Sequence, residues 1–328
     1  MHPIDREGIF INVINNHLAR LTLLSGGSGM LGTALKRALA ARQTPLLQLV
    51  RSTNPAPGQL TWDPNAVPAI PDRERLEGLD AAIHLSGASV AGHLWTPAYK
   101  REMGLSRVQS TNALATTLAA LRNPPKVLLV ASAIGIYGDR GDGMLDEGAL
   151  PGKGFLADLC VEWEAAARPA QDAGMRVVHA RFGVVLDRHS GALAKMLPLF
   201  RLGLGGRLGS GRQWMSWVGL PDVVSAVLFA LDTPEIQGPM NVTGPAPVTN
   251  AEFARVLGRV LHRPAILPAP AVALRIALGQ MADEALLASA RVFPSRLSSA
   301  GFRFAHPTLE CALRSIFMPS TFDTPTAS

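Results

Sequence analysis

Residues 19–32 read ARLTLLSGGSGMLG, a short apolar run followed by a loop with glycines at positions 26, 29 and 32. The run predicts a β-strand over residues 19–25, and the apolar periodicity after the loop predicts an amphipathic helix. Between a strand and a helix, Gly26 allows a tight turn, Gly29 lets a pyrophosphate approach the backbone, and Gly32 lets the helix pack close to the strand. Free amides at the helix start would bind the phosphates. The stretch therefore predicts a Rossmann-type dinucleotide-binding fold.

Strand-like and helix-like segments alternate along most of the chain, which is typical of a parallel sheet with helices on both faces. We predict strands over residues 46–50, 81–85, 127–131, 176–181 and 240–243. We predict helices over residues 106–121, 155–173, 222–231 and 250–261, the last with Asn250 as its N-cap. The predicted fold class is α/β, a doubly wound parallel sheet with a smaller helical region on the substrate side and at the C-terminus.

The pattern suggests four parts. Residues 1–18 precede the first strand and have no assigned role, residues 19–264 form the dinucleotide-binding domain, residues 265–317 form a small C-terminal domain, and residues 318–328 form a loose tail. The glycine-rich stretch 203–211 is expected to be a substrate-side loop.

Composition excludes several functional classes. The 328 residues are 48% hydrophobic and carry a formal net charge of +6, but the arginines are scattered, so we expect no nucleic-acid partner. No apolar run reaches the roughly 18 residues of a membrane span, and the N-terminus does not resemble a signal peptide. We therefore expect a cytoplasmic protein without a membrane partner. The two cysteines, Cys160 and Cys311, fit neither a metal-site spacing nor a disulfide framework.

The choice between NAD and NADP depends on the end of the second predicted strand. NAD enzymes of this architecture place an acidic residue about 20 residues beyond the glycine loop. Residues 33–62 contain no Asp or Glu, whereas Arg51 and Ser52 follow the strand. A guanidinium there would pair with the 2′-phosphate of NADP. The sequence thus favours NADP over NAD, unless Arg51 is simply a surface arginine.

Several short motifs, taken as a set, resemble the extended short-chain dehydrogenase/reductases. The resemblance is greatest to the atypical NAD(P)-dependent epimerase/dehydratase-like branch, the nucleoside-diphosphate-sugar epimerase type. Besides the glycine loop, the motifs are SGA at 86–88, SAIGIYG at 132–138, RFGVVL at 181–186, WMSWV at 214–218 and AGFRF at 300–304. The resemblance extends from about residue 20 to residue 317, and its last part resembles the small C-terminal domain of that branch.

The resemblance implies roles for individual residues. Those expected to contact the cofactor are Gly26, Gly29, Met30, Leu31, Gly32, Arg51, Ser52, Asp63, Ser86, Gly87, Ala88, Arg107, Gly183 and Val184. Of these, Asp63 would lie near the adenine, and Gly183 and Val184 near the nicotinamide. Arg107 stands where active relatives have an asparagine, and its permanent charge suits phosphate binding better than proton abstraction. Ser132 matches the hydroxyl that bonds the substrate oxygen in active relatives.

One part of the pattern is missing. Active members use a tyrosine with a lysine four residues later, because the lysine lowers the pKa of the tyrosine. This chain has only Tyr99 and Tyr137, and neither is followed by such a lysine. Phe155 and Leu159 stand at the expected positions. Tyr137 with Ser132 is the alternative catalytic pair, although a structural role for Tyr137 at the turn before Gly138 is the simpler interpretation.

Two functions fit these observations. The first is an NADP-dependent epimerase or oxidoreductase acting on a sugar nucleotide or a small carbonyl compound. The second is a catalytically weak or inactive NADP(H)-binding sensor or scaffold. The glycine loop supports both, and the sequence leaves the substrate and a homodimeric state open.

Overall fold

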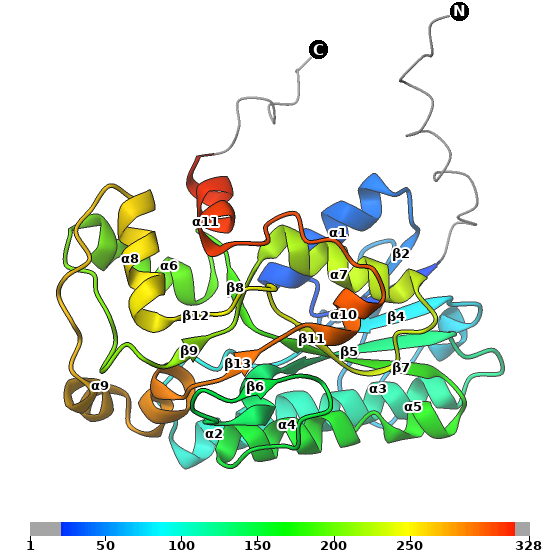
Figure 1. Ribbon diagram of the computed structural model, residues 1–328. Coiled ribbons are helices and arrows are strands. Elements are labelled where there is room, and N and C mark those ends of the chain that lie inside the picture. The colour runs from blue at the N-terminus through cyan, green and yellow to red at the C-terminus, as the bar shows by residue number, and fades with distance from the viewer. Residues whose placement is uncertain (1–20, 319–328) are drawn as a thin grey trace, which may run out of the picture.

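A computed structural model describes residues 21–318. The expected N-terminal extension, residues 1–18, lies outside these residues, as do residues 319–328 of the expected tail. Figure 1 shows a central sheet covered by helices on both faces.

The central sheet has seven strands in the order β11-β7-β5-β4-β1-β2-β3, and all neighbouring pairs are parallel. The strands are β1 (Thr22–Ser25), β2 (Leu46–Val50), β3 (Gln59–Thr61), β4 (Ala81–His84), β5 (Val127–Ala133), β7 (Arg176–Phe182) and β11 (Gly238–Val242). The chain starts in the middle of the sheet, moves out to β3, and returns to β4 on the other side of β1. The strand order reverses between β1 and β4, and α/β sheets bind ligands at the carboxyl ends of the strands beside such a reversal. The predicted Rossmann fold is confirmed.

The central strands are apolar because both sheet faces are covered. Every residue of β1 and β4 is buried, as are the first six of β5. Helices α1 (Met30–Ala41) and α7 (Leu220–Asp232) cover one face. The other face is covered by α2 (Pro97–Gly104), α3 (Ser110–Ala119), α4 (Phe155–Ala165) and α5 (Arg168–Asp172).

Three local expectations were wrong. The helix expected over 106–121 begins at Pro97 and contains a π-helical turn, Leu105–Gln109. The helix expected over 155–173 is divided into α4 and α5, and Pro169 lies in the first turn of α5, where its missing amide costs nothing. Helix α8 (Asn250–Val260) is capped by Thr249, whose side chain accepts a hydrogen bond from the Glu252 amide.

Asn250 has a different function from the predicted cap. Its side-chain oxygen accepts a hydrogen bond of 2.7 Å from the Leu208 amide, so it fixes the glycine-rich loop instead. The error arose because Thr249 and Asn250 are both good capping residues and the sequence does not decide between neighbours.

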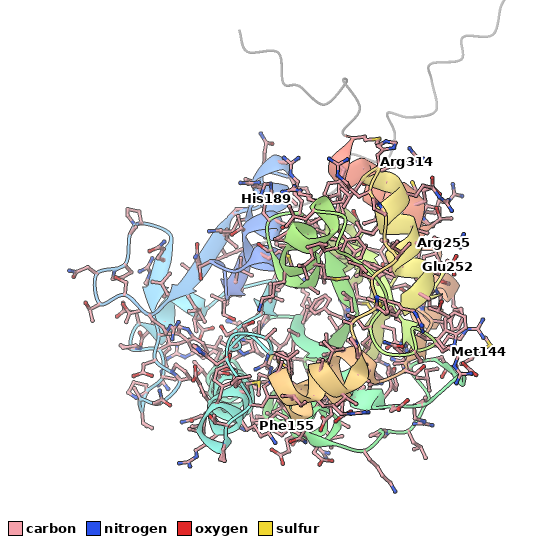
Figure 2. All side chains as sticks on the ribbon, turned by 90° about the vertical axis from the view of Figure 1, so that its left-hand side faces the viewer. Met144, Phe155, His189, Glu252, Arg255 and Arg314 are labelled. Carbon is pink, nitrogen blue, oxygen red and sulfur yellow. The ribbon has the colours of Figure 1, made fainter. Side chains whose placement is uncertain are left out.

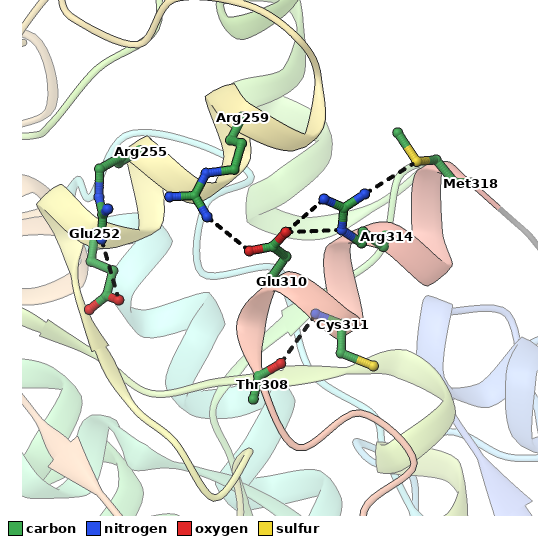
Figure 3. A network of polar contacts seen from close by, with 8 residues as sticks. All are labelled: Glu252, Arg255, Arg259, Thr308, Glu310, Cys311, Arg314 and Met318. Atoms are coloured by element: carbon green, nitrogen blue, oxygen red, sulfur yellow. Dashed lines mark hydrogen bonds and ion pairs between the residues drawn. The ribbon is translucent and has the colours of Figure 1, made fainter.

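The remaining elements connect the strands of the sheet or lie beside it. They are η1 (Arg73–Leu76), η3 (Ile134–Tyr137), β6 (Met144–Leu145), β8 (Val184–Leu186), α6 (Gly191–Arg201), β9 (Trp214–Met215), β10 (Trp217–Gly219), β12 (Val248–Thr249), α9 (Ala271–Leu278), η4 (Ala282–Leu287), β13 (Arg291–Val292), α10 (Ser295–Ser299) and α11 (Leu309–Phe317). A second apolar cluster joins α6, α8 and α11. On its surface Glu310 of α11 binds Arg259 of α8 at 2.9 Å and Arg314 at 2.7 Å (Figure 3).

Among the helices within residues 21–318, none combines the length and the apolar character needed to cross a bilayer.

Candidate functional site

The residues predicted to bind a cofactor lie along one edge of the sheet. The glycine loop follows β1, Arg51 and Ser52 follow β2, Asp63 comes shortly after β3, the turn 86–88 comes shortly after β4, and Gly183 follows β7. Parallel strands bring their carboxyl ends to the same edge, so positions more than 150 residues apart in the chain lie along one edge of the sheet. The structure therefore brings the predicted set together, although the role of each residue stays a prediction.

The glycine loop is shaped by two tight contacts and one open position. Gly26 has φ +72°, and an added Cβ would lie 2.7 Å from the carbonyl carbon of Leu85. An added Cβ on Gly32 would clash with the carbonyl oxygen of Gly26. At Gly29, by contrast, an added Cβ would meet only the Gly26 oxygen, at 3.5 Å. The first and third glycines are needed by the protein itself, whereas the second leaves space on the exposed side of the loop.

Helix α1 begins at Met30, directly after Gly29, and no side chain caps it. Its first amides and the positive end of its dipole therefore point toward the space beside Gly29. Met30 and Leu31 are half-buried, and Gly29 is exposed. This combination fits a pyrophosphate: an anion close to backbone amides with no Cβ in between.

The turn 86–88 is held in place by the π-helical turn in the helix behind it. The Ala88 amide donates a hydrogen bond of 3.0 Å to Ser106 Oγ, and the Ala88 oxygen accepts one of 2.7 Å from Arg107. The Arg107 guanidinium also lies 5.1 Å from the ring centroid of Trp163, and burial lowers the Arg107 pKa. Arg107 thus supports the turn from behind, and Ser86 and Gly87 lie on the turn itself. A π-helical turn is often found at functional sites. Here it brings the side chains of Ser106 and Arg107 into contact with the turn 86–88.

Below the glycine loop, His84 links the sheet to α3. Its Nδ1 lies 2.6 Å from Ser25 Oγ and its Nε2 lies 3.1 Å from Ser110 Oγ. Ser110 uses its only proton to bond the Ser106 carbonyl at 2.7 Å, so it accepts from His84. His84 therefore carries its proton on Nε2, and Ser25 donates to Nδ1. Complete burial lowers the His84 pKa to about 3, which keeps the ring neutral. Sequence analysis missed His84, although a histidine at the end of a buried strand was the available signal.

The residues predicted to lie near the adenine are all exposed. Arg51 and Ser52 are exposed, and Ser52 Oγ and the Asn54 amide hydrogen-bond at 3.2 Å. Asp63 is also exposed and accepts hydrogen bonds from Asn65.

Gly183 and Val184 are the residues predicted to lie near the nicotinamide. An added Cβ on Gly183 would lie 2.5 Å from the Ser216 oxygen, so this glycine is needed for packing. Val184 is half-buried and begins β8.

A buried polar network lies where β5, β7 and β11 end. Ser132 Oγ donates a hydrogen bond of 2.7 Å to Glu164 on α4. Arg181 binds the same carboxylate through two bonds of 2.8 Å, and it donates a third bond of 3.0 Å to the Tyr137 hydroxyl. That hydroxyl in turn donates to Asn241 at 2.7 Å. The network joins three strands, one helix and the turn after β5.

The electrostatics of this network hold Tyr137 neutral. Burial raises the Tyr137 pKa, and nearby Arg181 offsets only part of the increase. For Arg181, burial acts to lower the pKa, but its bonds to Glu164 more than compensate, so the pKa lies above the ordinary value. Both hydroxyls predicted to be catalytic therefore have their protons engaged inside the protein. Sequence analysis missed Glu164, Arg181 and Asn241. Because Ser132, Arg181 and Asn241 pair across adjacent parallel strands, the strand assignments contained the signal.

Comparisons with known proteins agree with this architecture. The sequence profile of the NAD dependent epimerase/dehydratase family matches residues 22–243. The chain belongs to this family. Residues 269–316 match a second profile, described as a domain of unknown function, DUF1731. The predicted family resemblance is confirmed.

Similar family members are found in bacteria and in animals. Epimerase family protein Mb2239 of Mycobacterium bovis is 46% identical over 290 residues, which cover 88% of this chain and 95% of that protein. The crystal structure of human epimerase family protein SDR39U1 with NADPH has a TM-score of 0.82 and 34% identity, covering 90% of this chain and 98% of that one. A nucleoside-diphosphate sugar epimerase from Corynebacterium glutamicum has a TM-score of 0.73 and 33% identity, covering 90% of this chain and 57% of that one.

In this epimerase-family chain, the positions predicted to replace the tyrosine and lysine are apolar and well packed. Phe155, the first residue of α4, has its ring 5.3 Å from Trp95 and 5.0 Å from Lys100 Nζ. Leu159 is 5% exposed and packs in a cluster with Tyr99 and Met103. Neither position offers a group that could exchange a proton.

A cavity of about 220 Å³ lies at the start of α4, where Leu156 lines it. Its walls come from the turn after β5, the start of α4 and the C-terminal helices, with Gly135, Lys153, Leu156, Arg275, Glu284 and Leu287 among its lining residues. The Glu284 carboxylate accepts hydrogen bonds from the Phe155 and Leu156 amides at 3.1 and 2.8 Å, so it caps α4. The cavity therefore adjoins both the family domain and the C-terminal region.

Proposed function

We propose that the chain binds NADP(H) along the carboxyl edge of its sheet and uses it to reduce a small carbonyl compound. The observation that carries this proposal is the uncapped start of α1 beside Gly29. Amides without side-chain partners next to an open glycine form a cradle for a pyrophosphate. Gly26, Met30 and Leu31 would hold the pyrophosphate, and Gly87 and Ala88 would lie beside it.

The preference for NADP over NAD rests on charge. Arg51 follows β2 and is exposed, and residues 33–62 contain no carboxylate to bind the ribose hydroxyls. A charge-assisted hydrogen bond from a guanidinium to a phosphate contributes about 1.5–3 kcal/mol. The human relative was crystallised with NADPH, which supports the same cofactor here.

Reduction fits the proposed site better than epimerisation does. When bound, NADPH supplies a hydride. Reduction of a carbonyl also needs one proton, which water can provide, whereas oxidation of an alcohol needs a base near neutral pH. Phe155 and Leu159 offer no base, and the Tyr137 proton is bound to Asn241. We assign the substrate to the cavity of about 220 Å³ at the start of α4, and this volume favours a small substrate over a sugar nucleotide, since pockets for drug-sized ligands are about 300–1,000 Å³.

A second candidate is an NADP(H)-binding sensor or scaffold without turnover. It is favoured by one specific observation, the packing of Phe155 and Leu159 into an apolar cluster with Trp95. Removal of a general acid or base costs about 10²–10⁴ in rate, so a member lacking both could retain binding alone.

Titration calorimetry with NADPH and NADH tests cofactor binding. We expect the protein to bind NADPH more tightly, and Arg51→Gln to reduce NADPH affinity by about 10–100-fold while leaving NADH affinity unchanged. Arg168→Gln, on the far surface of α5, is the control. If the protein binds neither nucleotide, both candidate functions are wrong.

Turnover then separates the two candidates. NADPH oxidation is followed with a panel of small aldehydes and ketones and with sugar nucleotides. Oxidation with at least one small carbonyl supports the reductase. Tight NADPH binding without oxidation across the panel supports the sensor.

A further inference from the structure

Exposed aliphatic side chains gather at one end of the molecule. Leu199 and Leu202 at the end of α6, Leu204 in the glycine-rich loop, Ile266, and Val272 and Ile276 on α9 are each 50–82% exposed. We call this set the α6–α9 surface. Isolated exposed leucines are normal, whereas several exposed aliphatic side chains on neighbouring segments point to an interaction site.

The segments that carry this surface run side by side. The Leu267 amide donates to the Gly205 oxygen at 3.2 Å, and Leu208 pairs with Ala269 as in a parallel sheet. An added Cβ on Gly203 would lie 3.2 Å from Pro264, so the loop lies against the chain that leads to α9. In Figure 1 α6, α8 and α9 lie together at the left-hand end, which Figure 2 views directly.

Helix α9 reads AVALRIAL, and none of its residues is buried. A helix that is apolar around most of its circumference is normally found in a protein core or against another apolar phase. Here it packs on the molecule mainly through its contact with η4. Its apolar surface is therefore available to a partner.

The charges around this surface are mostly positive. Residues 188–221 and 253–282, which contain the surface, carry nine Lys and Arg residues. Three of them, Arg255, Arg259 and Arg275, form ion pairs with Glu252, Glu310 and Asp283 just outside these ranges. Arg207 bonds the Ser210 oxygen at 2.6 Å, and Arg263 bonds the Arg201 oxygen at 2.9 Å. These guanidinium groups have backbone carbonyl oxygens as partners, so their charge is not neutralised by those bonds.

We propose that the α6–α9 surface docks the protein onto an anionic phospholipid bilayer. Aliphatic side chains that insert into the acyl region, beside arginines that contact the headgroups, are the combination that holds a peripheral protein on such a membrane. The expectation of no membrane partner came from the lack of a spanning segment. Peripheral docking needs no such segment, because folding assembles the apolar surface from separate parts of the chain.

The observations favour a bilayer over two other occupants. The six apolar residues are all Leu, Ile or Val, whereas strong protein–protein contacts are enriched in Trp, Tyr and Arg and poor in Leu and Val. A second copy of the chain would bring a second, mostly basic surface to the same interface, and like charges would repel.

Vesicle sedimentation tests the proposal with the full chain. We expect the protein to sediment with vesicles of phosphatidylcholine and phosphatidylglycerol, at about three to one, and not with phosphatidylcholine alone. About 0.5 M NaCl should reduce the bound fraction at least severalfold, because the arginine contribution is screened.

Matched variants localise the contact. The double variant Val272→Ser, Ile276→Ser removes exposed apolar side chains, and Arg201→Gln, Arg207→Gln removes charge; each should lower the bound fraction about fivefold or more. Val161→Ser on α4 and Arg168→Gln on α5 change the same residue types elsewhere and should bind as the unmodified protein does. Thermal unfolding confirms that each variant is folded.

Three results would overturn the proposal. The first is no sedimentation with anionic vesicles at low salt. The second is equal binding by the surface variants and the unmodified protein. The third is a dimer in analytical ultracentrifugation that Ile276→Ser dissociates while vesicle binding is absent, which would assign the surface to a second copy.

Discussion

Ser132 donates a hydrogen bond of 2.7 Å to Glu164, and the carboxylate that accepts it also accepts hydrogen bonds from Nε and Nη2 of Arg181. The side chains of Arg181 and Glu164 are only 8% and 14% exposed. A hydroxyl in this position closes a buried ion pair. To donate to a substrate oxygen, as predicted, Ser132 would first have to break its hydrogen bond to Glu164.

The first prediction concerns the stability of this ion pair. Glu164→Ala should lower the free energy of unfolding by about 3–5 kcal/mol, because it leaves the Arg181 charge buried without a partner. Ser132→Ala should cost only about 1 kcal/mol, the usual value for one hydrogen bond. Chemical denaturation measures both.

Asp172→Ala is the control for this comparison, since Asp172 forms an exposed ion pair with Arg168 at 2.9 Å. It should change the stability by less than about 0.5 kcal/mol. If Glu164→Ala is no more destabilising than Asp172→Ala, the network does not stabilise the fold as we describe.

The fold could be predicted because its signals are local. The run 127–131 is apolar throughout, as a strand covered on both sides must be, and the helix after Gly29 shows a simple 3.6-residue period. The π-helical turn at Leu105–Gln109 could not be predicted, because it depends on the tertiary contacts of Ser106 and Arg107 with Ala88. The same holds for the break before α5 and for the choice of Thr249 over Asn250 as a cap.

The candidate site was predicted where backbone geometry dictates the residue and missed where distant side chains meet. The spacing of the glycines predicts the loop. Because parallel strands end at one edge of the sheet, Arg51 and the turn 86–88 were expected at the same edge. The partners of Ser132 and Tyr137 come from positions up to 104 residues away. No periodicity encodes such contacts. Asn241 had only its place in a predicted strand as a signal, and Glu164, on a helix, became visible only in the structure.

The second prediction distinguishes two glycines of one motif. Gly29 has φ −75° and ψ 173°, which any residue adopts, and an added Cβ there has space. Gly29→Ala should therefore leave the free energy of unfolding within about 0.5 kcal/mol and weaken NADPH binding about tenfold or more. Gly32→Ala should cost about 1–3 kcal/mol of stability, because its methyl group would overlap the Gly26 carbonyl. Thermal unfolding measures the stability of both variants, and calorimetry measures their NADPH affinity. An equal loss of stability in Gly29→Ala and Gly32→Ala would contradict this prediction.

The third prediction uses the buried imidazole of His84. Its pKa is about 3 in the folded protein and about 6.5 in the unfolded chain, so between these values the unfolded state binds more protons. The stabilisation is complete above pH 6.5 and is lost as the pH falls toward 3. His84 alone should lower the free energy of unfolding by about 1.4 kcal/mol per pH unit in this range.

Urea denaturation at several pH values between 7.5 and 4.5 measures this slope. His84→Gln should make it shallower by about 1 kcal/mol per pH unit below 6.5. His189→Gln, which removes an exposed histidine on the loop before α6, should leave it unchanged. The slope that remains in His84→Gln comes from other groups, including buried His179, whose pKa is also lowered by burial. An unchanged slope in His84→Gln would show that the ring is not held neutral.

The fourth prediction introduces a tyrosine at position 155, where the family resemblance predicts one. Lys100 Nζ lies 5.0 Å from the ring centroid of Phe155, so a hydroxyl added to that ring enters the field of an ammonium group from a different helix. Phe155→Tyr should give a phenol with a pKa below the ordinary value of about 10, because a nearby positive charge favours the phenolate. The ultraviolet titration of Phe155→Tyr minus that of the unmodified protein isolates the new phenol, and burial raises the pKa of Tyr137.

The same variant should accelerate NADPH oxidation with any carbonyl that the unmodified protein reduces, by up to about 10²-fold, since it supplies a general acid. Adding Lys100→Met to Phe155→Tyr is the matched control: it should return the phenol pKa to about 10 and abolish most of the acceleration. Leu159→Lys is expected to fail as a repair, because Leu159 is 5% exposed among apolar side chains and a charge there would be desolvated. A phenol that titrates normally beside an intact Lys100 would mean that the ammonium does not face position 155 in solution, and the chain would then lack any substitute for the lysine of its active relatives.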